Sequence, residues 1–393
     1  MTGIKAGLQR IWLIAKREVQ RMCSHPVYFF CMLAAPAGCL FFFITLMQDG
    51  LPANLPIAVV DMDNTPTSRN LIRQLDTFGQ TSVAMQTCSF EEARIEMQKG
   101  NIYGIYYIPV NFQNDAGSNR QPKISFYTNS SYLIAGSLLF RDMKMMSELA
   151  GGYVGLQMGR AKGYTEEQIM AQIRPIVVDT HAIGNPWLNY SIYLNNTILP
   201  GILQLLIFLV TVYSIGTEIK YKTSREWLNL GNNSIAVGIL GKLLPHTFVF
   251  TLVGLLICAV LYGYNAFPLN SGWMPILSAV LLLVISSQAV GVFMIGVLPT
   301  IRLGLSFAAL FGMLGFSICG HSFPVSDMHP SIRAISYLYP LRHYILIYAD
   351  QALNGRHFIH TWSEYIWLSG FIILPFLIKR NLKNAMLYFY YIP

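Results

Sequence analysis

The sequence predicts an α-helical multi-pass membrane protein with six transmembrane helices, both termini in the cytoplasm, and an inserted α/β domain outside the cytoplasm. Three observations predict this fold class. Of the 393 residues, 53% are hydrophobic and only 12% are charged, whereas about a quarter of the residues in soluble domains are charged. Several apolar runs reach the roughly 20 residues that a helix needs to cross a bilayer. The stretch between the first two runs instead alternates strand and helix patterns.

The N-terminal residues 1–25 are basic and carry apolar residues at helical spacing: Ile4, Leu8, Ile11, Trp12, Ala15, Val19 and Met22. This pattern predicts a cytoplasmic amphipathic helix that lies on the inner membrane surface. One alternative is a plain cytoplasmic extension of the first span. Another is a signal peptide cleaved near "LAAPAG" (33–38), which is disfavoured because the apolar run continues well past that site.

The membrane spans follow from the apolar runs. Residues 26–48 supply the first span, and residues 195–393 supply five more, with runs near 197–217, 243–263, 274–298, 303–320 and 361–378. With the N-terminus inside, thirteen basic residues lie in short inner segments and only Arg333, Arg342 and Arg356 in short outer ones. This asymmetry satisfies the positive-inside rule. We therefore interpret the net charge of +8 as an orientation signal and expect no nucleic-acid partner.

Residues 49–194 are expected to form a compact extracytoplasmic α/β domain, in which Gly151-Gly152 interrupts a long helix and a last strand lies near residues 175–179. Its first strand leads into "VVDMDNTPTSRN" (59–70), in which two aspartates have the spacing found in haloacid-dehalogenase phosphatases. That chemistry also needs a later acidic pair to complete the magnesium site, and the domain has neither an Asp-Asp pair nor a Gly-Asp-x-x-x-Asp pattern. The residues are instead interpreted as a structural turn that caps the next helix, formed by Asp61, Asp63, Thr65, Pro66 and Arg69. No catalytic residue is predicted, and no Cys/His spacing predicts a metal site.

The energy source is expected to lie outside this chain. The five strongest apolar runs contain no Asp, Glu, Lys or Arg, whereas ion-coupled carriers keep such groups at membrane depth to bind the coupling ion. His246 is a polar exception at the start of the third span. It is interpreted either as a helix-end histidine bonded to a carbonyl or as a protonatable switch.

Three motifs in order carry a family resemblance. The connection 217–235 is charged and short-helical; with the following turn of the next span it holds Glu218, Lys222-Thr223-Ser224, Glu226, Leu228 and Gly241-Lys242. The other two are "LPIAVVDMDNTPTSRNLIRQL" (55–75) and "FPVSDMHPSIRAISYLYPLRHYI" (323–345). Together they resemble the membrane subunits of type-2 ATP-binding-cassette exporters, in the branch with a large domain between spans one and two. Lys-Thr-Ser departs here from the family's Arg-Gly-Thr-like turn.

The resemblance implies a permease subunit of an ATP-driven exporter in the inner membrane of a bacterial cell. Its substrate would be a hydrophobic or amphipathic compound, such as a drug or a lipid-like molecule. ATP and magnesium would bind separate cytoplasmic ATPase subunits, so this chain would be no enzyme and would need no cofactor of its own. Coupling to the ATPase would use Glu218, Lys222, Arg225, Glu226, Leu228 and Lys242. Two alternatives stay open: a non-transporting anchor or mechanotransmitter, and a membrane enzyme that uses the outer domain.

Further partners are expected from the architecture. Six spans are too few to enclose a pathway for a large substrate, so we expect a second permease chain, identical or similar. Small residues on the fifth span would let a helix approach closely, either from the second subunit or within one subunit: Gly304, Ala308, Gly312 and Gly315. Residues 321–355 contain three prolines and predict short helices that re-enter at the outer surface. Membrane lipid and a periplasmic adaptor protein complete the expected partners.

Overall fold

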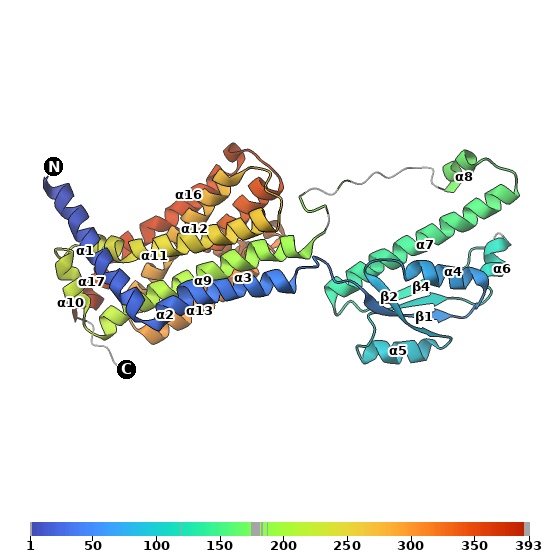
Figure 1. Cartoon of the computed structure of the whole chain (residues 1–393), viewed down its shortest axis with the longest axis horizontal. Coiled ribbons are helices and arrows are strands. Elements are labelled where there is room, and N and C mark those ends of the chain that lie inside the picture. The colour runs from blue at the N-terminus through green and yellow to red at the C-terminus, as the bar shows by residue number, and fades with distance from the viewer. Residues whose placement is uncertain (1, 119, 174–180, 182–183, 187, 389–393) are drawn as a thin grey trace. The chain divides into compact units, whose positions relative to one another are not determined.

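The computed structural model describes residues 2–118, 120–173, 181, 184–186 and 188–388 (Figure 1). The chain divides into two compact units, one formed by Met1–Gln48 with Ala182–Pro393 and the other by Asp49–His181. The second unit ends before the expected boundary at residue 194, because the second span already begins at Tyr190. The Asn189 side chain fixes this start by accepting hydrogen bonds from the backbone N–H groups of Ser191 and Ile192.

The first unit contains six helical segments that are long and apolar enough to cross a membrane, counted over the described residues. They agree with the six expected spans. In chain order they are α2–η1–α3 (Pro26–Phe29, Phe30–Ala34, Ala35–Leu46), α9 (Tyr190–Lys220), α11–η2 (Ile235–Cys258, Ala259–Tyr264), α12 (Trp273–Val297), α13 (Ile301–Ile318) and α16–η6–α17 (Trp362–Gly370, Phe371–Ile373, Leu374–Tyr388).

The second and fourth spans form the centre of this helical unit. In the most apolar stretch of α9, 67% of the residues are buried, and in α12 the share is 72%, against 22% in α13. The peripheral spans expose large apolar side chains, including Phe41 on α3 and Leu310 on α13. Soluble proteins rarely expose such a large apolar surface to water. These faces are therefore suited to contact with lipid or with another membrane subunit.

The small-residue stripe of α13 packs inside the chain. A Cβ atom at Gly312 would lie 2.5 Å from Cδ1 of Leu205 on α9, and one at Gly304 would lie 2.9 Å from Cγ1 of Val212. Ala308 is fully buried. The stripe therefore lets α13 approach α9 closely. Of the two expected roles for these residues, the structure shows packing within one subunit in place of contact with a second one.

The outer segment between α13 and α16 contains short helices. They are η3 (Val325–Asp327), α14 (Pro330–Ser336), α15 (Pro340–Ile347), η4 (Tyr348–Leu353) and η5 (Phe358–His360). Leu341, Tyr344 and Ile347 of α15 are buried in the same apolar core as residues of α9 and α12. α15 therefore dips into the helical unit instead of lying on its surface.

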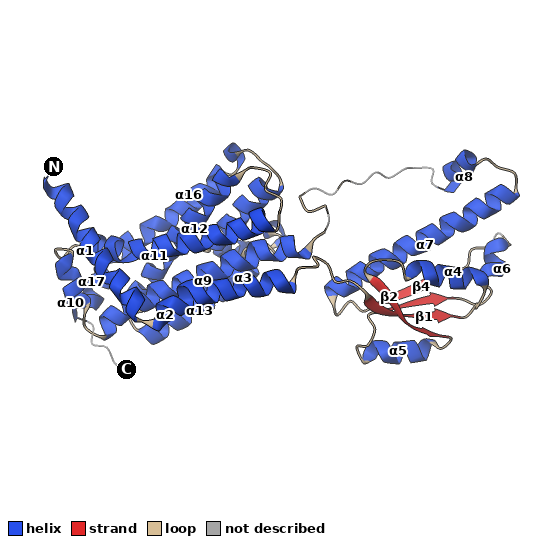
Figure 2. Cartoon of the chain, viewed as in Figure 1, coloured by secondary structure: helices blue, strands red, loops and turns tan. Residues whose placement is uncertain are grey.

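The second unit is a three-layer α/β domain (Figure 2). Its sheet has the order β2 (Thr81–Thr87), β1 (Leu55–Asp61), β3 (Gly104–Ile108), β4 (Ser125–Thr128), parallel except for β4. One face packs on α4 (Pro66–Leu75), α6 (Phe112–Gly117) and α7 (Leu133–Ala161), and the other on α5 (Phe90–Gln98). A further strand expected near residues 175–179 lies outside the described residues.

α7 runs unbroken through Gly151-Gly152, where the sequence indicated an interruption. Two glycines cost a helix only about 1 kcal/mol each relative to alanine, and tertiary packing offsets this here. α8 (Glu166–Ile173) covers the last turns of α7, where a Cβ at Gly159 would lie 2.4 Å from Cγ1 of Ile169. Gly155 and Gly159 therefore make room for α8.

The turn after β1 uses its polar side chains internally. Asp61 Oδ1 accepts hydrogen bonds from the backbone N–H groups of Asp63 and Asn64, both at 3.0 Å, and its Oδ2 accepts from the Ser68 hydroxyl at 2.6 Å. Thr65 forms a capping box with Ser68, and Pro66 occupies the first helical position of α4. Both oxygens of Asp61 are thus engaged within the turn.

Asp63 and Arg69 complete this turn. Asp63 Oδ2 accepts from the Thr65 hydroxyl at 2.6 Å and from the Gln113 backbone N–H at 3.1 Å. Arg69 Nη1 donates to the backbone carbonyl of Asn64 at 3.2 Å. The arrangement stabilises the strand-to-helix connection.

Candidate functional site

A short helix, α10 (Ser224–Leu230), connects the second and third spans on the side that the basic residues mark as cytoplasmic. Trp227 is buried, and its Nε1 donates to the Gly238 carbonyl of α11 at 3.1 Å. The Ser224 hydroxyl donates to the Met386 carbonyl of α17 at 2.7 Å. α10 is therefore held against the third and sixth spans, so a displacement of α10 is resisted by both.

One face of α10 is open. Arg225, Glu226 and Asn229 are exposed, as is Lys222 in the turn before the helix. Leu228 is only 1% exposed and packs in the core. Because it is buried, Leu228 supports α10 from behind, and its expected part in coupling stays a prediction.

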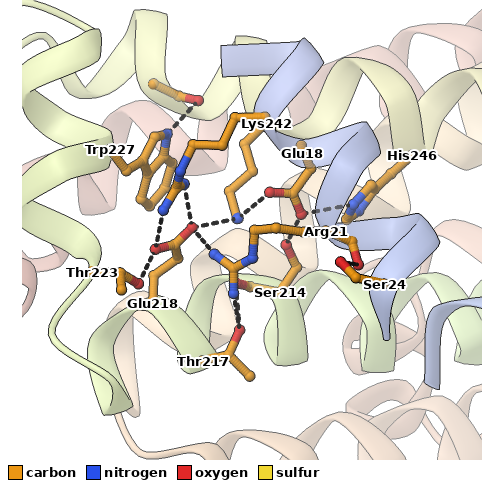
Figure 3. Close-up of polar contacts among 12 residues, drawn as sticks. Glu18, Arg21, Ser24, Ser214, Thr217, Glu218, Thr223, Trp227, Lys242 and His246 are labelled. Atoms are coloured by element: carbon orange, nitrogen blue, oxygen red, sulfur yellow. Dashed lines mark hydrogen bonds and ion pairs between the residues drawn. The ribbon is translucent and has the colours of Figure 1, made fainter. Parts of the chain in front are cut away.

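Two more of the expected coupling residues are buried behind α10. Glu218, near the end of α9, is 0% exposed, and Lys242 on α11 is 1% exposed. Lys242 Nζ donates to Glu218 Oε1 at 3.1 Å and to Glu18 Oε2 at 2.6 Å (Figure 3). Glu18 belongs to α1 (Thr2–Ser24), which precedes the first span. One ammonium group therefore joins α1, α9 and α11.

Arginines of α1 extend this cluster. Arg17 donates to both oxygens of Glu218, at 2.7 and 3.1 Å, a bidentate geometry that is among the stronger ionic contacts. Arg21 forms a further ion pair with Glu218 and donates to the Thr217 hydroxyl at 3.3 Å. The Thr223 hydroxyl, in the turn before α10, also donates to Glu218. Glu218 thereby links α1 to the start of α10.

The remaining contacts of Glu18 come from the second and third spans. The Ser214 hydroxyl of α9 donates to its Oε1 at 2.8 Å, and His246 Nε2 lies 3.1 Å from the same oxygen. A carboxylate accepts hydrogen bonds, so Nε2 of His246 carries a proton. His246 therefore bonds to a carboxylate of another helix and not to a carbonyl as expected, while its buried Nδ1 has no partner in the described part of the chain.

Glu18 is held in its ionised form. Burial opposes its charge, but the ammonium of Lys242 and the hydrogen bond from His246 outweigh burial and keep the pKa of Glu18 well below its usual range. Three cations, Arg17, Arg21 and Lys242, face two carboxylates, Glu18 and Glu218. Removing one partner from such a cluster leaves a buried charge without compensation, so its members depend on one another.

Sequence reasoning missed Glu18, Arg17 and Arg21. The expected surface role of α1 holds for only one face: Trp12 is 70% exposed, whereas Ile14 is 1% exposed. The signal was the placement of Glu18 one turn after Ile14, on an apolar face of the helix. Gly241 permits this packing, because a Cβ there would lie 2.8 Å from Cβ of Ile14.

Six apolar spans, a short connecting helix and a buried ionic cluster behind it define a multi-pass membrane protein in which ion pairs link α1, α9 and α11. A family model described as ABC-2 family transporter protein matches residues 26–378. The chain therefore belongs to the ABC-2 family and is the membrane subunit of an ATP-binding-cassette transporter, which pairs with an ATPase subunit. No curated protein matches the chain.

Proposed function

We propose that this chain is the permease subunit of an ATP-driven exporter and that α10 is the helix on which the cytoplasmic ATPase docks. One observation carries the proposal: Lys242 and Glu218 join α1, α9 and α11 directly behind α10. Closure of the ATPase pair displaces the docked helix, and buried ion pairs resist separation of the helices that they link. The displacement therefore moves the spans together, as in a rigid-body transition.

The docking contacts fall to the open face of α10 and the turn before it. Lys222, Arg225 and Glu226 are exposed there, and charged residues of this kind set orientation and association rate at an interface. Glu218 and Lys242 act behind that face by holding α10 on the spans. Coupling thus uses two layers, an outer one that contacts the ATPase and an inner one that transmits the motion.

Two adjoining cavities support an amphipathic substrate. One of about 530 Å³ has basic and aromatic walls that include Arg17, Arg21 and Tyr213. The next, of about 420 Å³, shares Tyr213 and is lined mainly by apolar residues of the first, second and fifth spans, among them Val27 and Leu305. A compound with an anionic end and an apolar body matches this pair. A second permease chain, identical or similar, would face the same spans and complete the pathway.

Export by such a subunit also implies a membrane and a partner on the outer side. The protein acts in the inner membrane of a bacterial cell, and the outer α/β unit is the surface for a periplasmic adaptor. The anchor alternative predicts ATPase docking without transport, and the two cavities favour transport over it. The enzyme alternative is disfavoured because the carboxylates of Asp61 and Asp63 are used in the turn before α4.

The test is purification of the full chain from its native membrane in mild detergent, followed by mass spectrometry of the proteins that accompany it. We expect a nucleotide-binding ATPase together with one further permease chain for each copy. Recovery of the chain without an ATPase, under conditions that keep a known transporter complex intact, would overturn the proposal. An accompanying ATPase without substrate transport in reconstituted vesicles would favour the anchor.

A further inference from the structure

A groove of about 720 Å³ opens between the third, fourth and sixth spans, away from the ionic cluster. Ile239 and Leu243 of α11 and Ala289 of α12 form its buried floor. Phe248 of α11 and Phe376 of α17 stand at its mouth and are 64% and 56% exposed. An apolar groove of this size does not hold ordered water. In a membrane-spanning unit, a groove with an apolar floor and exposed aromatic residues at its opening therefore faces the lipid.

The groove lies in the cytoplasmic half of the membrane. It begins at Ile235, the first residue of α11, and ends at Thr251. Sixteen helical steps of 1.5 Å give a length of about 24 Å. Roughly 15 Å of it matches the share of one leaflet in the hydrocarbon core, and the remainder lies at the cytoplasmic membrane surface beside α1. Leu8 and Ile11 of α1 close the cytoplasmic end. The groove therefore has the length and the position for an acyl chain of the inner leaflet.

The cytoplasmic end of the groove is positively charged. Lys379 lines it, is exposed, and makes no hydrogen bond or ion pair within the described residues. Lys5 stands three residues before Leu8 and is also exposed, so it shares the helix face that reaches the groove. No carboxylate lines the groove. An anionic headgroup is the complement of such an end, since each basic residue near an anionic membrane surface strengthens lipid binding.

The deep end of the groove carries one polar feature. Gln288 is 3% exposed; its Oε1 accepts from the Thr247 hydroxyl at 2.7 Å, whereas its Nε2 has no partner in the part of the chain that the structure describes. This amide lies at the level of Thr247, twelve residues from the cytoplasmic start of α11. It is therefore too deep to contact the headgroup, and headgroup selection falls to the basic end.

We propose that this groove binds an anionic phospholipid of the inner leaflet, with one acyl chain between α11, α12 and α17 and the phosphate beside Lys379. The site is distinct from the substrate cavities, which involve the first, second and fifth spans. It requires only that the chain span a membrane, so it does not depend on docking of the ATPase. The occupant is a resident lipid, whose headgroup charge holds α1 and α17 at the cytoplasmic surface.

The test uses the full chain in nanodiscs of phosphatidylcholine that contain a small share of phosphatidylglycerol with a photoreactive acyl chain. After illumination, labelled peptides are mapped by mass spectrometry. We expect labelling to concentrate on residues 236–251 of α11, above the level on the later turns of the same helix, where Leu252 and Leu256 are exposed and lie outside the groove. Unlabelled phosphatidylglycerol should compete, and added phosphatidylcholine should not.

Variants separate the headgroup contact from bulk lipid. Lys379→Gln should lower the groove labelling about fivefold, the effect of one basic residue near an anionic surface. Arg380→Gln removes the same charge from an exposed neighbour that does not line the groove, and it should change little. Ala236→Trp fills the cytoplasmic end from an exposed position and should abolish the labelling. Gln288→Leu should leave the preference for the anionic headgroup unchanged.

Two results would overturn the proposal. Equal labelling of residues 236–251 and of the later turns of α11 would show bulk lipid only, and equal effects of Lys379→Gln and Arg380→Gln would show no headgroup site. Neither result depends on whether an ATPase accompanies the chain, so failure of the lipid site can be told apart from failure of the exporter proposal.

Discussion

Lys242 Nζ lies 2.6 Å from Glu18 Oε2, and this contact joins the third span to a helix that precedes the first one. Both side chains are 1% exposed. A buried ion pair contributes little net stability relative to apolar residues of the same shape, but removing only one of its two partners is strongly destabilising. Its value here is therefore positional, because it keeps α1 attached to the spans behind α10.

Replacement of Lys242 with Met should destabilise the protein strongly. It leaves Glu18 and Glu218 buried without their shared ammonium group, and loss of one partner from a buried pair costs about 3–5 kcal/mol. Thermal unfolding of the full chain in detergent measures the loss. Lys16→Met removes an exposed lysine of α1 and serves as the control. Equal melting temperatures for the two variants would contradict the cluster.

The stability that Glu18 contributes should depend on pH. Its pKa is held below the usual value of about 4.5 in the folded protein, so the ionised form is favoured by folding. That contribution is complete above the usual carboxyl pKa and is lost as the pH falls below it toward the lower folded pKa. The difference in unfolding free energy between the unaltered chain and Glu18→Gln should therefore shrink on acidification below about pH 4.5. A constant difference would show that folding does not lower the pKa of Glu18.

Charge reversal at Glu226 should weaken ATPase docking without unfolding the chain. Glu226 is exposed on α10, and a repulsive charge at an interface lowers affinity and association rate. We expect about tenfold less recovered ATPase for Glu226→Lys at physiological salt. Glu167→Lys makes the same change at an exposed position of the outer unit and is the matched control. Undiminished recovery with Glu226→Lys would place docking elsewhere.

Alanine at Gly241 should loosen α1 from α11. The added Cβ would lie 2.8 Å from Cβ of Ile14 and 2.9 Å from the backbone carbonyl of Ile11. Backbone cannot yield as a flexible side chain does, so we expect a cost of about 1–3 kcal/mol, the usual range for overpacking. Faster hydrogen exchange in α1 would report it. Gly7→Ala, where nothing lies within 4 Å of the new atom, should leave exchange unchanged or slow it.

Removal of the Thr65 hydroxyl should destabilise α4 in the outer unit. Thr65→Ala deletes the N-cap acceptor for the Ser68 backbone N–H, a change worth about 1 kcal/mol. Hydrogen exchange of the α4 peptide in the full chain measures it. Thr77→Ala removes an exposed hydroxyl that only donates to the Gln74 carbonyl, and it should have a smaller effect. Equal effects would argue against the cap.

Local features were readable from the sequence. The six spans could be predicted because hydrophobic length is a property of consecutive residues, and the turn after β1 because Thr65 and Pro66 act within a few residues of their partners. The break expected at Gly151-Gly152 was wrong, because the continuity of α7 depends on a distant contact. α8 packs on the last turns of α7 and offsets the low helix propensity of glycine.

The ionic cluster needed the tertiary structure. The sequence alone predicted that this chain crosses a membrane six times and which side faces the cytoplasm, and it determined that the connection after the second span is charged. Only the fold decided that Glu18 contacts Lys242, 224 residues away. It also decided that Glu218 is buried, although its charge had suggested a position on the surface. The physical reason is that burial of an ionised group depends on partners brought by distant segments, which no pattern of neighbouring residues specifies.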